Sequence, residues 1–186
     1  ADGNTFTDDG SGNGSYTMAD GSSGTYSADG SSTHTDANGN TSSMDSDGNG
    51  SYTNSDGSSG SFSADGSSTH TDAEGNSHSV DADGNETYTG ADGSSGTMDA
   101  DGSGTYSSAD GSTSTFDADG GGSYTSADGS SSTWDADGNG SYTNADGSSG
   151  TYSADGSSSH TDADGNSHSV DADGNETFTG ADGSSG

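Results

Sequence analysis

Residues 136–153 read ADGNGSYTN ADGSSGTYS, and repeats of this nine-residue unit decide the fold. Glycine recurs every nine residues from Gly3 to Gly183, usually after Ala-Asp. Ala-Asp-Gly-Asn and Ala-Asp-Gly-Ser are turn sequences, because Gly supplies a positive φ while Asp and Asn bond to their own backbone. The triplets that follow, such as the Ser-Tyr-Thr of residues 141–143, favour strands. Each unit therefore predicts one turn and one short strand.

A second rhythm has a period of 18 residues, because the one large side chain of each unit alternates between the seventh and eighth positions. Tyr142 occupies the seventh position of its unit, and Tyr152 occupies the eighth position of the next. We therefore predict an all-β solenoid (β-roll) with two units per coil and roughly ten coils, stacked about 4.8 Å apart. In that fold the large residues point inward as two facing columns. An alternative points the Tyr side chains outward as a binding row, but it leaves only Ser and Gly for the core.

The repeat covers the whole chain, so we predict a single continuous array over residues 1–186. Residues 46–96 and 136–186 are nearly identical at an offset of 90 residues, as a duplication would produce. The first and last residues both fall inside the repeat. We therefore expect the chain to be a segment of a longer repetitive protein.

The charge of the chain is wholly negative: 32 acidic residues and no Lys or Arg give a formal charge of -32. Only 19% of residues are apolar, which is typical of a disordered chain or of a repeat held by backbone hydrogen bonds and bound ions. Divalent cations are the expected partners. Nucleic acid is excluded because phosphate contacts need Lys or Arg. No apolar run approaches the roughly 18 residues of a membrane span, so we predict no membrane insertion.

Solenoid stacking would place one Asp of every unit in a column, with successive carboxylates about 4.8 Å apart. Something divalent would have to lie between them, and alternating oxygen ligands on a tight Gly-bearing turn suit Ca²⁺. Residues 135–140 read D-A-D-G-N-G, and similar turns recur. The predicted calcium ligands are Asp45, Asp47, Asn49, Asp81, Asp83, Asn85, Asp99, Asp101, Asp117, Asp119, Asp135, Asp137, Asn139, Asp162, Asp164, Asn166, Asp171, Asp173 and Asn175. The alternative role of these Asp residues is to form the turns and keep the chain soluble.

These turns resemble calcium loops of the EF-hand type over about six residues, without the bidentate Glu that closes such a loop. The nine-residue period, the acidity and the one apolar residue per unit also resemble the RTX calcium β-roll, whose repeat is G-G-x-G-x-D-x-U-x. The register differs, since here Asp precedes Gly. The resemblance therefore implies the β-roll architecture and several Ca²⁺ ions along the rod, but no ligand assignment.

Two further groups of residues are candidates for chemistry. The Asn-x-Ser/Thr sequons are possible acceptors of covalent glycans: Asn13, Asn40, Asn49, Asn85, Asn139 and Asn175. The histidines are candidate transition-metal ligands, although core or surface filling explains them more simply: His34, His70, His78, His160 and His168. Ser and Asp occur everywhere and near-identical coils lack a single concave pocket, so we predict no enzyme.

The sequence thus predicts a structural segment of an extracellular fibre, surface layer or adhesin stalk, located outside the cell or at its surface. It would be stabilised by calcium, open to glycosylation, and self-associating. One alternative is an ice-binding β-solenoid that uses ranks of outward Ser and Thr. A second alternative is an acidic, mineral-associated disordered repeat protein.

Overall fold

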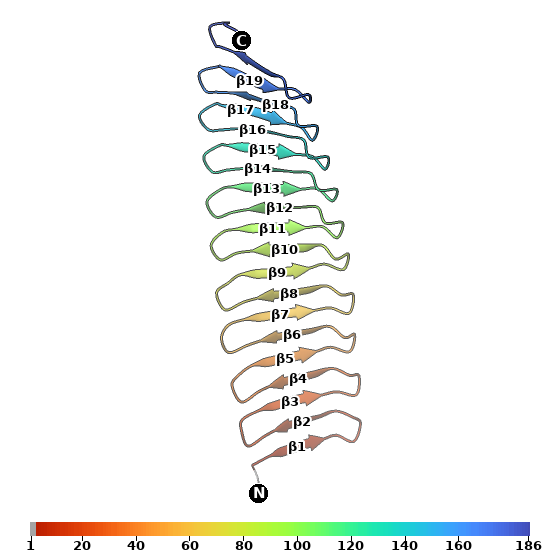
Figure 1. Cartoon of the computed structure of the whole chain (residues 1–186). Helices are drawn as coiled ribbons and strands as arrows, with labels where there is room; N and C mark the ends of the chain where they lie inside the picture. Colours follow the sequence, from red (N-terminus) through yellow and green to blue (C-terminus); the bar gives the residue numbers. More distant parts are fainter. Residues whose placement is uncertain (1–2) are drawn as a thin grey trace. The chain divides into compact units, whose positions relative to one another are not determined.

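The computed structural model describes residues 3–186, which form strands and turns and contain no helix able to cross a membrane. The chain divides into two units, Ala1–Asp92 and Gly93–Gly186, each with ten four-residue strands (Figure 1). Unit 1 contains β1 (Thr5–Asp8), β2 (Gly14–Thr17), β3 (Ser23–Tyr26), β4 (Ser32–Thr35), β5 (Thr41–Met44), β6 (Gly50–Thr53), β7 (Ser59–Phe62), β8 (Ser68–Thr71), β9 (Ser77–Val80) and β10 (Glu86–Thr89). Unit 2 contains β11 (Ser95–Met98), β12 (Gly104–Ser107), β13 (Thr113–Phe116), β14 (Gly122–Thr125), β15 (Ser131–Trp134), β16 (Gly140–Thr143), β17 (Ser149–Tyr152), β18 (Ser158–Thr161), β19 (Ser167–Val170) and β20 (Glu176–Thr179).

Within each unit every strand pairs antiparallel with the next strand in the sequence. A five-residue loop reverses the chain each time. In the loop of residues 135–139, the N–H of Asp135 donates to the carbonyl oxygen of Asn139 at 2.8 Å, and the N–H of Gly138 donates to the carbonyl oxygen of Asp135 at 3.1 Å. Gly138 has a φ of 89°, a left-handed conformation that favours glycine. Each unit is therefore an open β-meander.

The predicted β-solenoid of two-unit coils is wrong. In a solenoid each strand would lie parallel to the strand two units away, but here each strand pairs with its immediate neighbour in the opposite direction. The physical reason lies in the loop. A four-residue strand and a five-residue reversing loop together use all nine residues of a unit, so each unit closes a hairpin instead of half a coil.

The 18-residue rhythm follows from the antiparallel register. Tyr142, third in β16, lies opposite Gly150, second in β17, while Tyr152, fourth in β17, lies opposite Gly140, first in β16. Side chains alternate between the two faces along a strand. A large residue that is third in one strand and fourth in the next therefore stays on the same face. The large residue therefore occupies the seventh position of its unit when the strand runs in one direction and the eighth position when the strand runs in the other.

No hydrophobic side chain is buried in the part of the chain that the structure describes; the buried polar residues are Ser58, Ser94, Ser112 and Ser148. The predicted inward columns of Tyr, Phe, Met, Val and Trp are therefore wrong as a core. In each unit a strand contacts only the strands beside it, so no second layer covers either face. The backbone ladder and the cross-strand side-chain pairs hold such a sheet together.

Candidate functional site

The large side chains of the strands lie on one face of each unit, which we call the ring face. It carries Phe6, Tyr16, Tyr26, His34, Met44, Tyr52, Phe62, His70, His78, Val80 and Tyr88 in unit 1, and Met98, Tyr106, Phe116, Tyr124, Trp134, Tyr142, Tyr152, His160, His168, Val170 and Phe178 in unit 2. They form two columns that cross the strands, and most recur at every second strand, about 9.6 Å apart. Tyr124 is 43% exposed and Tyr152 is 42% exposed. Extended exposed apolar surface of this kind marks an interaction site.

Glycines on the ring face allow the rings to lie down on the sheet. A Cβ atom at Gly150 would stand 2.6 Å from Cζ of Tyr142, and one at Gly122 would stand 2.7 Å from Cζ2 of Trp134. Neither position has room for a side chain. The ring in turn covers backbone that glycine leaves open, as in aromatic rescue of glycine in designed sheets.

Three rings also bond to the large residue two strands further on. The Tyr142 hydroxyl lies 2.8 Å from Nδ1 of His160, and the two rings stack with centroids 6.2 Å apart. The same pairing joins Tyr16 to His34 and Tyr52 to His70, each at 2.6 Å. These contacts fix the orientation of both side chains, so the ring face presents ordered groups to solvent.

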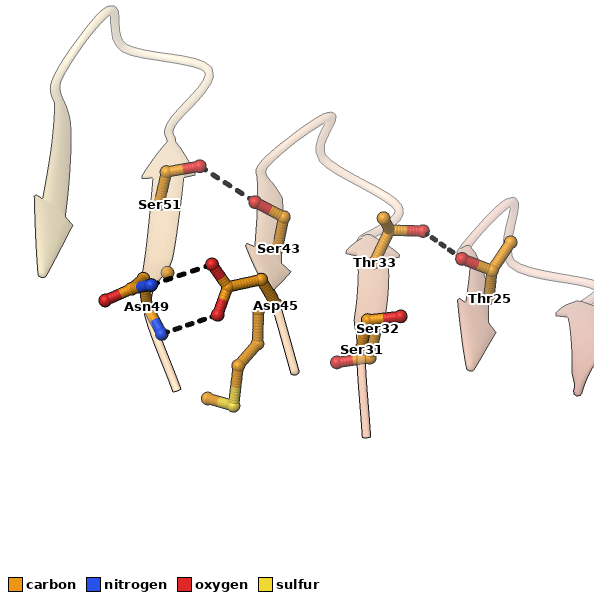
Figure 2. A pocket seen from close by; sticks show the side chains of 10 residues that line it. Thr25, Ser31, Ser32, Thr33, Ser43, Asp45, Asn49 and Ser51 are labelled. Carbon is orange, nitrogen blue, oxygen red and sulfur yellow. Dashed lines mark hydrogen bonds between the residues drawn. The ribbon is translucent and has the colours of Figure 1, made fainter. Parts of the chain in front are cut away.

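The opposite face carries only Ser and Thr apart from the loops, and we call it the hydroxyl face. Its hydroxyls pair across strands, for example Thr25 with Thr33 at 2.7 Å and Ser43 with Ser51 at 2.8 Å (Figure 2). These four residues, together with Asp45 and Asn49, line a hollow of about 370 Å³. Met44 of the ring face also lines this hollow, but the strand residues of the hydroxyl face itself offer hydroxyl groups and no large apolar side chain.

The predicted calcium ligands all lie in the five-residue loops that join strands. In the loop of residues 45–49, Oδ1 of Asp45 accepts a bond from the N–H of Asp47 at 2.9 Å. Oδ1 also accepts a bond from the N–H of Asn49 at 2.9 Å, and Oδ2 accepts one from Nδ2 of Asn49 at 2.8 Å (Figure 2). The loops that begin at Asp81, Asp135, Asp162 and Asp171 repeat this pattern. Both carboxylate oxygens of the first Asp therefore accept hydrogen bonds within the loop.

In loops that end in Ser, the carboxylate of the third residue accepts the hydrogen bonds from the last residue of the loop. Asp101 accepts the N–H of Ser103 at 2.9 Å and its hydroxyl at 2.7 Å, and the same hydroxyl lies 3.2 Å from Oδ2 of Asp99. The predicted ligands Asp117 and Asp119 lie in a loop that ends in Gly121 and has no side chain at this position. Across residues 3–186, no three His, Cys, Asp or Glu side chains gather in a way that could hold a metal ion. The calcium ligands, which include Asn oxygens as well as carboxylates, stay a prediction from the sequence.

Hydrogen bonding also sets the acidity of the loop carboxylates. Donation from the Asn49 side chain, and then from its backbone N–H, holds the pKa of Asp45 below its usual range. The Ser103 hydroxyl, and then its backbone N–H, lowers the pKa of Asp101 in the same way. Loops on one edge of a meander are two strands apart, about 9.6 Å, which halves the pairwise Coulomb energy expected at 4.8 Å. The spacing of the loops therefore lowers the repulsion between neighbouring carboxylates, which was the reason for expecting a bound ion.

The asparagines of the predicted glycosylation sites hold neighbouring loops together. Nδ2 of Asn139 donates to Asp135 in its own loop at 2.8 Å, and Oδ1 accepts the N–H of Ala154, in the next loop on the same edge, at 3.0 Å. Asn13 and Asn49 make the same two kinds of bond, and Asn40 bonds to Asp36 and Ser55. Asn85 and Asn175 donate to the first Asp of their loops. A glycan on any of these nitrogens would replace one of its two N–H bonds and leave the other to donate to Asp.

The fold is similar to that of solved TCP10 domains. The TCP10 domain of CPAP from Danio rerio, in complex with a peptide of Danio rerio STIL, matches over 96% of this chain and 99% of that chain, with a TM-score of 0.58 and 20% sequence identity. The same wild-type domain without the peptide matches over 88% and 98%, with a TM-score of 0.51 and 21% identity. No protein-family model and no curated protein matches the sequence. At this identity the likeness shows the fold alone.

The likeness corrects the recognised family, and the strand pairing of this chain corrects the predicted functions. The fold matched is that of a TCP10 domain, an antiparallel sheet, and not the RTX β-roll or a stack of EF-hand-type loops. The calcium-stabilised extracellular fibre segment and the ice-binding alternative both required a solenoid, and the mineral-associated alternative required a disordered chain. All three are wrong for this ordered, open meander. An outward row of Tyr was the less favoured alternative from the sequence. A Gly eight or twelve residues away, directly opposite on the next strand, could have favoured it at Tyr16, Tyr26, Tyr52, Tyr142 and Tyr152.

Proposed function

We propose that this chain is a non-enzymatic binding platform whose ring face takes an extended segment of a partner protein. The observation that carries the proposal is the ordered array of exposed large side chains over a sheet with no buried hydrophobic residue among those described. An apolar array that serves no core is explained if a partner covers it. The rings are held by bonds such as that between Tyr142 and His160, so little side-chain entropy is lost on binding.

The spacing of the rings favours a partner in the polyproline II conformation. Successive large residues of a column stand two strands apart, about 9.6 Å. A polyproline II helix rises about 3.1 Å per residue with three residues per turn, or about 9.3 Å per turn. A segment laid across the strands would therefore place every third residue above the next ring of the column. Docking of preformed polyproline II segments on aromatic surfaces is a recurring mode of recognition.

The charge of the platform selects a cationic partner. The loops along both strand ends carry the Asp carboxylates, and the whole chain has a formal charge of -32. A segment with Lys or Arg would be drawn to this field over about a Debye length. Arg would also stack on exposed Tyr rings. We therefore propose a proline-containing, basic segment as the ligand.

The solved domain of similar fold lends support of a limited kind. The TCP10 domain of Danio rerio CPAP was solved with a peptide of STIL, so a sheet of this fold accommodates a peptide in that protein. The proposal for this chain rests on its own ring face and charge. Divalent cations are proposed as mobile counterions of the loop carboxylates; self-association and an extracellular location stay predictions from the sequence.

The single tryptophan provides the test, because Trp134 lies on the ring face of unit 2. We expect a short synthetic peptide of alternating Pro and Arg residues to change the Trp134 emission on titration. A peptide with the same Arg content, but Gly and Ser in place of Pro, should bind more weakly, since it must be ordered on binding. Raising the salt concentration should weaken both interactions.

Two variants on one strand locate the surface. Tyr124→Ser removes a ring-face side chain and should raise the Kd about tenfold or more. The matched control Thr125→Ala changes the adjacent residue, which faces the opposite side, and should leave the Kd within about twofold. Equal binding of the two peptides would mean that the interaction depends on charge alone and not on the polyproline II conformation. An unchanged Kd in Tyr124→Ser, or a loss in Thr125→Ala, would remove the ring face as the site.

A further inference from the structure

In each unit two histidines stand directly opposite each other on neighbouring strands. His70 on β8 faces His78 on β9, and His160 on β18 faces His168 on β19. Residues in this relation have Cβ atoms about 4.5–5.5 Å apart on the same face. The fifth histidine, His34, faces Gly24 and Ser42 instead. The chain therefore contains two imidazole pairs and one matched single imidazole.

Each paired imidazole has one ring nitrogen engaged and the other open. Nδ1 of His70 lies 2.6 Å from the Tyr52 hydroxyl, and Nε2 of His78 lies 3.0 Å from Oε2 of Glu86. If these nitrogens carry the protons and donate, the lone pairs stand on Nε2 of His70 and Nδ1 of His78. An outer partner that takes the second ring N–H is the usual arrangement around a metal-binding histidine, because it fixes the tautomer and the ring orientation.

Unit 2 repeats the arrangement with its own residues. The Tyr142 hydroxyl lies 2.8 Å from Nδ1 of His160, and Oε2 of Glu176 lies 3.3 Å from Nε2 of His168. The His168 side chain is 45% exposed and that of His78 is 44% exposed, so a dissolved ion can reach both. The same four residue types thus occur in the same order on the ring face of both units.

We propose that the His70–His78 pair and the His160–His168 pair each bind one transition-metal ion of the Zn²⁺ class. Tetrahedral Zn²⁺ with Zn–N bonds of about 2.0–2.1 Å needs two nitrogens about 3.3 Å apart, within reach of rings on directly opposite residues. Imidazole nitrogen suits Zn²⁺, Cu²⁺ and Ni²⁺ and is a poor ligand for Ca²⁺ or Mg²⁺. No third His, Cys, Asp or Glu of residues 3–186 completes either site, so water fills the remaining positions.

The test is calorimetric titration of the full chain with Zn²⁺ at about 0.15 M salt, with excess Mg²⁺ present to occupy the loop carboxylates. We expect two ions per chain. The variant His78→Asn should leave one ion bound, and the double variant with His168→Asn should leave none. Glu86→Gln should weaken one site by about tenfold, since outer partners contribute to affinity. The matched control His34→Asn should bind two ions like the parent chain.

Two results would overturn the proposal. Zn²⁺ binding that survives in the double variant would assign the ion to carboxylates, and a site lost in His34→Asn would show that the opposed pairs are not special. Far-UV circular dichroism of each variant checks the fold. If His78→Asn disturbs unit 1, the site of unit 2 still reports through His168→Asn alone, and an unchanged stoichiometry there refutes the proposal.

Discussion

Replacing Gly150 by alanine tests whether the rings lie on the sheet. A Cβ atom there would stand 2.5 Å from the Ser159 carbonyl oxygen and 2.6 Å from Cζ of Tyr142, whereas ordinary contacts begin near about 3.4 Å. Both the Ser159 backbone and the Tyr142 ring must shift, and the shift of the ring endangers its 2.8 Å bond to His160. Overpacking costs about 1–3 kcal/mol and a lost hydrogen bond about 1 kcal/mol, against a gain of about 0.5–1 kcal/mol from the less flexible unfolded chain. We expect Gly150→Ala to lower the free energy of unfolding by about 2 kcal/mol.

Urea unfolding followed by circular dichroism and by Trp134 fluorescence measures this change. The matched control is Ser132→Ala, because Ser132 faces the same Tyr142 from the other side and already carries a Cβ atom. It should change the stability by no more than about 0.5 kcal/mol. If Gly150→Ala is as stable as the control, the ring does not rest on the glycine, and the account of alternating large and small residues on the ring face is refuted.

Three further predictions follow from the loops. Because hydrogen bonds hold the pKa of Asp135 and similar carboxylates below the ordinary value of 3.8, their contribution to stability is complete above that value. It is lost as the pH falls through their lower folded pKa values. The melting temperature should therefore drop steeply below about pH 4 and stay level from there to neutrality. Asn139→Ala removes the bonds to Asp135 and Ala154 and should destabilise unit 2 by about 1 kcal/mol. Asn139→Ser should cost less, since the Ser130 hydroxyl accepts the corresponding bond from Ala145. Ca²⁺ and Mg²⁺ at equal concentration should raise the melting temperature equally if they act as counterions. A larger rise with Ca²⁺ would instead indicate a specific calcium site.

Local features of the fold could be predicted from the sequence. The loop glycines with positive φ and the short strands follow from the residues themselves: Gly138 takes a φ of 89°, and β16 is the strand Gly140–Thr143. The turn-forming role of Asp, weighed as the alternative to calcium binding, matches the bonds that Asp45 accepts within its own loop. These features depend on interactions within five residues, which a single repeat contains.

The arrangement of the strands could not be predicted in the same way. A reversing loop and a solenoid corner use the same residue types, and both place a strand every nine residues. The decisive information is the relation between units, in which Tyr142 meets Gly150 and Tyr152 meets Gly140. The opposed histidines His70 and His78 likewise come together only through the antiparallel register. Periodicity alone does not give the strand direction, so the sequence favoured an inward core over the outward Tyr row and did not predict the imidazole pairs.

The antiparallel register also limits how such a chain can change its length. Loss of a single nine-residue unit would reverse the direction of every strand that follows. All later large side chains would then move to the opposite side of the sheet, among the hydroxyls. Loss or gain of two units at once leaves every side chain where it was. The two near-identical blocks are offset by 90 residues, ten units and therefore an even number, so a duplication of this kind lengthens the protein without inverting it.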